Sequence, residues 1–145
     1  MVALAGERGT AVASGAMRIE HLRPSGTLDT VTTFQYSQAV RVGDLLLVAG
    51  QAGWNERLEI PADYADECRA VFDNLATVLR AAGCDFGDVV DAVSLHAAGT
   101  DLAAFWAVRN EYIRAPWPAW TTIGDIALAF PTMHVEIKVT AVVPS

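Results

Sequence analysis

The hydrophobic pattern is most regular between Pro118 and Val143, close to the end of the chain. This stretch contains a short apolar strand candidate, a turn at Pro131-Thr132, and then a strict alternation of apolar and polar residues. Met133, Val135, Ile137, Val139 and Ala141 alternate with His134, Glu136, Lys138 and Thr140. A period of two with β-branched residues predicts a strand that has one face in the core. The polar face of this strand carries the carboxylate of Glu136.

The longest helix is predicted from Ala62 to Ala82. Its apolar residues recur three and four positions apart, at Tyr64, Cys68, Val71, Phe72, Leu75, Val78, Leu79 and Ala82. This spacing forms one apolar stripe. Pro61 suits the first turn and Gly83 suits the end of such a helix. Cys68 lies on the stripe, which favours a small buried side chain over a reactive thiol.

The remaining elements follow from shorter patterns. Strands are predicted at 18–22, 35–42, 45–49 and 89–97, and a second helix at 102–113. Gly43-Asp44 indicates a hairpin, Asp101 suits the cap of the second helix, and Pro24 to Thr33 has the composition of a polar loop. The order strand, strand, strand, helix, strand, helix, strand, strand predicts an α+β fold. We expect one mixed sheet of six strands with two helices packed on one face.

The strand from Leu45 to Ala49 is apolar on both of its faces. Helices that pack on one side of the sheet would leave the other side of this strand uncovered. A partly apolar second face needs a cover, and in a chain of this length another copy is the expected one. The pattern therefore predicts a homo-oligomer.

Composition excludes several classes of protein. The 145 residues suit one domain, which we place at 17–145, after a predicted disordered extension at 1–16. The net charge of −7 argues against binding to a nucleic-acid backbone, and no apolar run is long enough to predict a membrane span. Only two cysteines occur, Cys68 and Cys84, so a reducing cytoplasm is the expected location.

Motifs for common cofactors are missing from the sequence. It contains no P-loop, no GxGxxG and no CxxC, and His21, His96 and His134 are widely separated. We therefore expect no metal and no cofactor. His96 lies in a predicted strand, where a structural or surface role is favoured over a catalytic one. The four tryptophans are expected in core and interface packing, because the acidic charge disfavours a platform for stacking bases.

Several short segments together resemble one known family. They are Tyr36–Val40, Gly43–Gln51, Asp73–Leu75, Ala81–Gly83, Asp88–Val90, Phe105, Tyr112, Pro118-Ala119 and Val135–Ile137. From about Met17 to Val143 the chain resembles the RidA family, also called the YjgF or L-PSP endoribonuclease family. The resemblance implies a chorismate-mutase-like α+β fold and a homotrimer with clefts between subunits.

The resemblance also implies an activity. Deaminases of the family hydrolyse reactive enamines and imines, such as 2-aminoacrylate, to 2-keto acids and ammonia. Their key group is an arginine directly after Pro-Ala, which binds the substrate carboxylate as a bidentate partner, and no neutral side chain replaces it. This chain has Trp120 at that position.

The other family positions give the candidate site. By resemblance Glu136 is the acid that handles water or a proton, and Tyr36 is the tyrosine at the cleft. Arg109 stands where the family has an asparagine, and Ala49 where it often has a serine. The candidate catalytic residues are Glu136 and Tyr36, and the candidate substrate-binding residues are Trp120, Arg109, Ala49, Gly50 and Thr122.

The sequence leaves several functions open. One is an enzyme that hydrolyses or tautomerises an enamine, an imine or a related carbonyl metabolite. A second is a non-catalytic homotrimer that binds a small molecule, and a third is an endoribonuclease, which the acidic charge disfavours. We expect Glu136 to lie in a pocket between subunits near Tyr36 and Trp120. The alternatives are a surface pair of Glu136 with Lys138 and an exposed, ion-paired Arg109.

Overall fold

The structure is a computed structural model that describes residues 17–145. The expected disordered extension at 1–16 lies outside the described residues. The strands are β1 (Ile19–Leu22), β2 (Ala39–Val42), β3 (Leu45–Gln51), β4 (Val89–Ala97), β5 (Ala119–Ile126) and β6 (Val135–Val142). The helices are α1 (Thr30–Phe34), α2 (Tyr64–Ala81), α3 (Leu102–Tyr112) and the 3-10 turn η1 (Phe86–Asp88).

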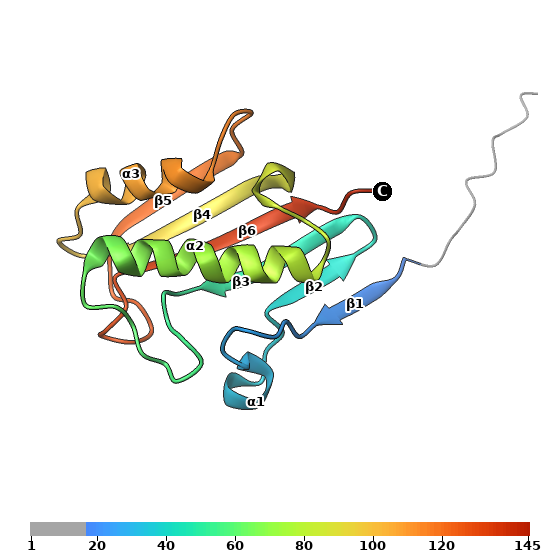
Figure 1. Cartoon of the computed structure of the whole chain (residues 1–145), viewed down its shortest axis with the longest axis horizontal. Helices are drawn as coiled ribbons and strands as arrows, with labels where there is room; N and C mark the ends of the chain where they lie inside the picture. The colour runs from blue at the N-terminus through green and yellow to red at the C-terminus, as the bar shows by residue number, and fades with distance from the viewer. Residues whose placement is uncertain (1–16) are drawn as a thin grey trace, which may run out of the picture.

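The six strands form one mixed sheet in the order β1-β2-β3-β6-β4-β5. Only β4 and β5 run parallel, and the other neighbours are antiparallel. The long helix α2 and helix α3 lie side by side over one face of the sheet (Figure 1). The predicted six-stranded α+β fold with two helices on one face is confirmed.

Strand β6 occupies the middle of the sheet, between β3 and β4. The predicted alternation is confirmed, because Val135, Ile137 and Val139 are buried in the core under the helices. Glu136 and Lys138 point to the opposite face, where Glu136 is half-buried and Lys138 is exposed. The predicted turn at Pro131-Thr132 is also present.

Helix α2 buries the apolar stripe that its sequence predicts. Gly83, with φ of 74°, follows the helix in the left-handed conformation that glycine adopts without strain. Cys68 is fully buried, and burial raises the pKa of its thiol to about 11. It is therefore a protonated packing residue, as expected.

Two predictions near the N-terminal end are wrong. The expected loop at 24–33 contains the start of α1, whose first turn is capped by the Asp29 carboxylate. The strand expected at 35–42 begins only at Ala39, because Gln35 ends α1 with φ of 62° and Gln38 turns its amide inward to Thr27 and Leu28. A helix of five residues has too few turns to show a period of 3.6.

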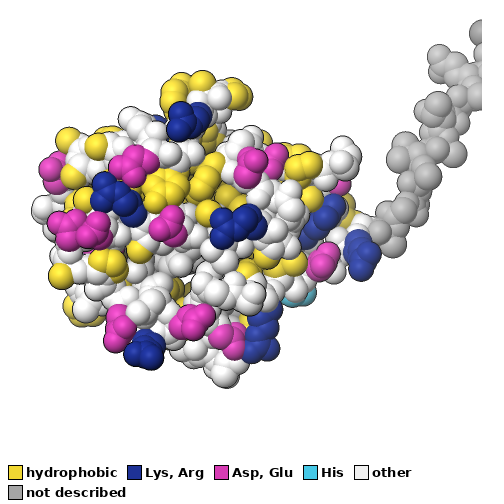
Figure 2. All heavy atoms as spheres, viewed as in Figure 1, with side chains coloured by type: hydrophobic (Ala, Val, Ile, Leu, Met, Phe, Trp, Pro, Cys, Tyr) yellow, Lys and Arg dark blue, Asp and Glu magenta, His cyan; other side chains and the backbone are white. Residues whose placement is uncertain are grey.

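The sheet face without helices carries exposed apolar side chains. Leu45 and Leu47 of β3, Ile123 of β5 and Val142 of β6 are each more than 40% exposed. The helical face presents acidic and basic side chains that are intermixed, without a continuous basic surface (Figure 2).

In the described part of the chain no helix has the length and apolar character needed to span a bilayer.

Candidate functional site

A cavity of about 430 Å³ opens beside the Glu136 side chain. Its lining residues are Phe34, Tyr36, Ala49, Gly50, Trp54, Ala129, Phe130, Met133 and Glu136. Four of the seven predicted site residues therefore lie in one pocket: Tyr36, Ala49, Gly50 and Glu136. Strands β3 and β6 supply Ala49, Gly50 and Glu136, so the carboxylate stands on a rigid part of the fold.

Gly50 makes room for the Glu136 carboxylate. The pairing of β3 with β6 shifts register between Val48 and Gln51, and this irregularity brings the backbone of Gly50 close to the acid. A Cβ atom at position 50 would lie 1.9 Å from Oε1 of Glu136. Any larger residue here must push the carboxylate away from its place in the pocket.

Burial controls the charge of the site. Desolvation by burial raises the pKa of Glu136 above its ordinary value. In the described part of the chain Glu136 forms no ion pair, so the surface pair with Lys138 is wrong. The pKa of Tyr36 is also raised, first by burial and second by the charge of Glu136. Burial therefore favours the protonated form of Glu136 relative to a carboxyl in free solution.

Aromatic rings form most of the remaining wall. Phe34 lies 5.9 Å from both Trp54 and Phe130, and 6.2 Å from the nearly parallel ring of Tyr36, measured between ring centroids. Trp54 meets Phe130 edge to face at 6.0 Å. Among the described residues that line the pocket, Glu136 alone carries a charge.

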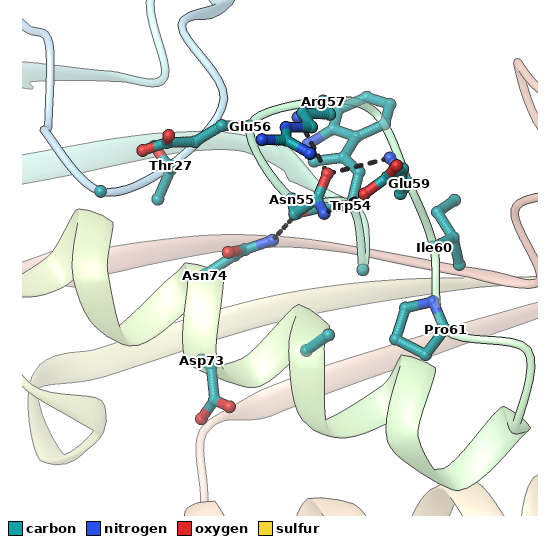
Figure 3. Close-up of a pocket in the computed structure, with 13 residues that line it drawn as sticks. Thr27, Trp54, Asn55, Glu56, Arg57, Glu59, Ile60, Pro61, Asp73 and Asn74 are labelled. Carbon is teal, nitrogen blue, oxygen red and sulfur yellow. Dashed lines mark hydrogen bonds between the residues drawn. The ribbon is translucent and has the colours of Figure 1, made fainter.

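The loop that presents Trp54 is held from below by α2. The amide of Asn74 donates to the carbonyl oxygens of Ala52 and Trp54 at 2.8 and 2.9 Å, and Figure 3 shows it reaching from the helix to the loop. Within the loop, the side-chain oxygen of Asn55 accepts hydrogen bonds from the backbone N–H groups of Arg57 and Glu59. These bonds fix the backbone on which the Trp54 ring stands.

Trp120 lies on the other face of the sheet. Its register partner on β4 is Ala92, a fully buried core residue, so both side chains point toward the helices. The indole N–H of Trp120 donates to Oγ of Ser94 at 2.9 Å, and the same Oγ lies 2.9 Å from Nε2 of His96. Within one subunit Trp120 and Glu136 are thus separated by the sheet. Thr122, farther along β5, is exposed and outside the pocket.

Arg109 belongs with Trp120. Its guanidinium carbon lies 4.6, 5.1 and 5.5 Å from the ring centroids of Trp120, Trp106 and Trp117. Burial lowers the pKa of this guanidinium, and its Nη1 donates to Oδ1 of Asn110 at 3.2 Å. In the described residues Arg109 forms no ion pair, so the exposed, ion-paired alternative is wrong. The indoles themselves stabilise the cation.

Sequence reasoning missed a buried carboxylate next to the pocket. Glu67 on α2 is 1% exposed and accepts hydrogen bonds from His134, from the backbone N–H at 2.7 Å and from the ring Nδ1 at 2.8 Å. Gly53 packs against the same glutamate. A signal existed, because Glu67 lies three residues after Tyr64 and four before Val71, on the apolar stripe.

Comparison with known proteins gives a consistent result. The family model described as endoribonuclease L-PSP matches residues 28–143. The RutC family protein YjgH of Escherichia coli K12 is 39% identical over 123 residues, which are 83% of this chain and 92% of that protein. A solved structure of a protein YJGH superposes with a TM-score of 0.79 at 37% identity, over 87% of this chain and 97% of that one.

A relative with a named activity is also similar to the chain. The 2-iminobutanoate/2-iminopropanoate deaminase of Dermatophagoides farinae is 33% identical over 105 residues, which cover 71% of this chain and 81% of that protein. The family model matches residues 28–143, and these relatives and the superposed structure cover 71–87% of this chain. The chain therefore belongs to the RidA family, also named for YjgF and for endoribonuclease L-PSP.

Proposed function

We propose that this protein hydrolyses or tautomerises a small reactive enamine or imine, with Glu136 as the acid/base. The observation that carries the proposal is the half-buried carboxylate at the wall of a pocket of about 430 Å³ that Tyr36 also lines. Its raised pKa suits a group that takes a proton from water and returns it to nitrogen. The deaminase names of several relatives support the same chemistry.

The proposed site is completed by a second subunit. Trp120 and Arg109 lie across the sheet from Glu136, so they can join it only from a neighbouring copy. The exposed apolar face with Leu45 and Leu47 supplies a surface on which copies could assemble. We propose a homotrimer, in which each cleft combines Glu136 and Tyr36 of one chain with the tryptophan-lined wall of the next.

The oligomeric state gives a direct prediction. Size-exclusion chromatography with light scattering should report a particle of about three times the 15.5 kDa chain mass at micromolar concentration. Leu47→Glu, which places a charge on the exposed apolar face, should shift the particle toward lower mass. A stable monomer of the unmodified chain would contradict the proposal that the cleft forms between subunits.

Small imino acids should be poor substrates. Without the family arginine, binding of the substrate carboxylate should lose about 2–5 kcal/mol, or roughly thirtyfold to several thousandfold in the rate at low substrate. The measurement is the rate of 2-iminopropionate hydrolysis, beside that of a relative that carries the arginine. An equal rate would mean that another group binds the carboxylate, and Arg109→Gln would be the variant to test next.

Gly50 offers a test of the pocket that spares the fold. Gly50→Ala should reduce turnover by about a hundredfold, because the new Cβ displaces the catalytic carboxylate. Gly124→Ala is the matched control, since a Cβ at that strand position meets no atom within 4 Å. Both variants should keep the circular dichroism of the parent. Unchanged turnover in Gly50→Ala would show that the carboxylate position does not matter.

A non-catalytic binding protein is the second candidate. Arg109 is enclosed by indoles and Trp120 donates its N–H to Ser94, so neither is arranged as a carboxylate clamp within one chain. This arrangement is compatible with a pocket that keeps its ligand unchanged. Tight binding of imines or ketones with no acceleration of hydrolysis, across a panel that differs in size and charge, would favour the binding function.

A further inference from the structure

We propose that the pocket at Glu136 selects an imine or enamine that carries an aryl group and no carboxylate, held as its iminium cation. The inference rests on the proposed function, because it names the substrate class of the same site. It follows from three observations: the size of the pocket, the sign of the charge on its lining residues, and the groups that the nearby cations contact.

The pocket is large and aromatic for a three-carbon imino acid. Its volume of about 430 Å³ falls in the range of roughly 300–1,000 Å³ that suits drug-sized ligands. Phe34, Tyr36, Trp54 and Phe130 surround it, with neighbouring centroids about 6 Å apart. Ring–ring contacts of this kind stabilise a bound aryl group beyond the simple burial of apolar area. A small polar imino acid would leave these walls in contact with water.

The charge that one chain contributes to the pocket is negative. Glu136 is the one charged residue among the described lining residues, and it is half-buried. A ligand carboxylate would meet this like charge in a partly desolvated space, which is unfavourable. An iminium would instead pair with the carboxylate, and the faces of the surrounding rings attract cations. The pocket thus combines an anion with π faces, as sites for organic cations do.

The cations that could receive a ligand carboxylate are placed elsewhere. Arg109, which a neighbouring copy would bring to the cleft, has its guanidinium packed against three indoles, whose faces already stabilise the cation. Trp120, at the position of the family arginine, donates its only N–H to Ser94. Lys138 is on the same sheet face as Glu136, but it is exposed and does not line the cavity. A substrate without a carboxylate needs none of these groups.

The reaction balances with water as the only co-reactant. The Glu136 carboxylate takes a proton from water while the water oxygen bonds to the iminium carbon, and the C=N π electrons move to nitrogen. Glu136 then returns the proton to the amino nitrogen. Glu136 then accepts the hydroxyl O–H proton as the C=O bond forms and the C–N bond breaks, and it passes this proton to the released ammonia. The iminium and water become a carbonyl compound and ammonium.

Binding of two matched probes tests the inference without catalysis. 2-Phenylethylammonium and 3-phenylpropionate share the same aryl arm and carry opposite charges. Titration calorimetry on the full chain should show the ammonium binding at least tenfold more tightly. Glu136→Gln should remove most of this preference, and Lys138→Met should leave it in place. Equal or tighter binding of the carboxylate, or no binding of either probe, would overturn the inference.

Turnover separates this inference from the proposed function. A flavin-dependent amine oxidase makes the carboxylate-free imine from 2-phenylethylamine, and an amino acid oxidase makes the imines of phenylalanine and alanine. We expect this protein to accelerate hydrolysis of the carboxylate-free aryl imine at least tenfold more than that of either imino acid. A preference for the imino acids would contradict this inference and would leave the proposed function intact. If the ammonium probe binds but no imine is hydrolysed faster than in buffer, the proposed function fails.

Discussion

Glu136→Gln should abolish turnover of whichever imine proves to be the substrate, by a factor of about 10² to 10⁴. That is the usual contribution of a positioned acid/base, and the amide can neither take nor return a proton. The substitution keeps the shape of the side chain that Gly50 accommodates. Steady-state rates of ammonium release, measured with the oligomeric state checked in the same buffer, test this expectation. Activity that survives in Glu136→Gln would make the residue part of the scaffold.

The same substitution has a predicted effect on stability that depends on pH. Burial holds the pKa of Glu136 above its unfolded value. The protonated form is therefore favoured by folding, and this contribution is present below the unfolded pKa and lost as pH rises through the folded pKa. At pH 7–8 Glu136→Gln should melt at the same temperature as the parent or higher, and the difference should shrink toward pH 4. Glu20→Gln, at an exposed position on β1, is the control.

Glu67→Ala should give the largest loss of stability among the polar substitutions considered, about 2–4 kcal/mol in the free energy of unfolding. The change removes both hydrogen bonds to His134, leaves its backbone N–H without an acceptor, and opens a cavity beside Gly53. Urea denaturation measures the effect. Glu67→Gln retains an oxygen acceptor and should lose about half as much or less.

Glu67→Ala should also disturb the pocket, because Glu67 contacts residues next to two of the side chains that line it. His134 follows Met133, and Gly53 precedes Trp54, and both Met133 and Trp54 line the cavity. Glu67→Ala should therefore weaken binding of 2-phenylethylammonium under conditions where the chain is fully folded. A variant that unfolds at the same urea concentration as the parent would show that the hydrogen bonds with His134 contribute nothing net.

Periodic patterns explain why much of the fold could be predicted. The alternation in β6 and the stripe on α2 are each long enough to repeat several times, so their buried faces follow from sequence alone. Helix α1 could not be found in this way, since five residues form little more than one turn. The positive φ of Gln35 is likewise a local feature that no periodic pattern predicts.

The family resemblance and the alternation along the strands predicted part of the candidate site, but not the contacts between distant residues. Tyr36 and Glu136 were matched to family positions, and the structure places both in one pocket. That Trp120 points to the other face depends on its pairing with Ala92 of β4, a contact between residues 28 positions apart. The bond of Glu67 to His134 joins residues still farther apart, and periodicity carries no information about such pairs.

The setting of Trp120 has a consequence for how this site can be altered. A Trp120→Arg substitution would supply the arginine that the family resemblance implies, yet it would replace an indole whose ring centroid lies 4.6 Å from the Arg109 guanidinium carbon with a second cation. It would also remove the indole donor from Ser94 and one of the rings that stabilise the existing cation. An arginine at position 120 is therefore disfavoured while residue 109 is also an arginine. We therefore expect the two positions to be coupled, so that Trp120→Arg is tolerated better in an Arg109→Asn background than alone.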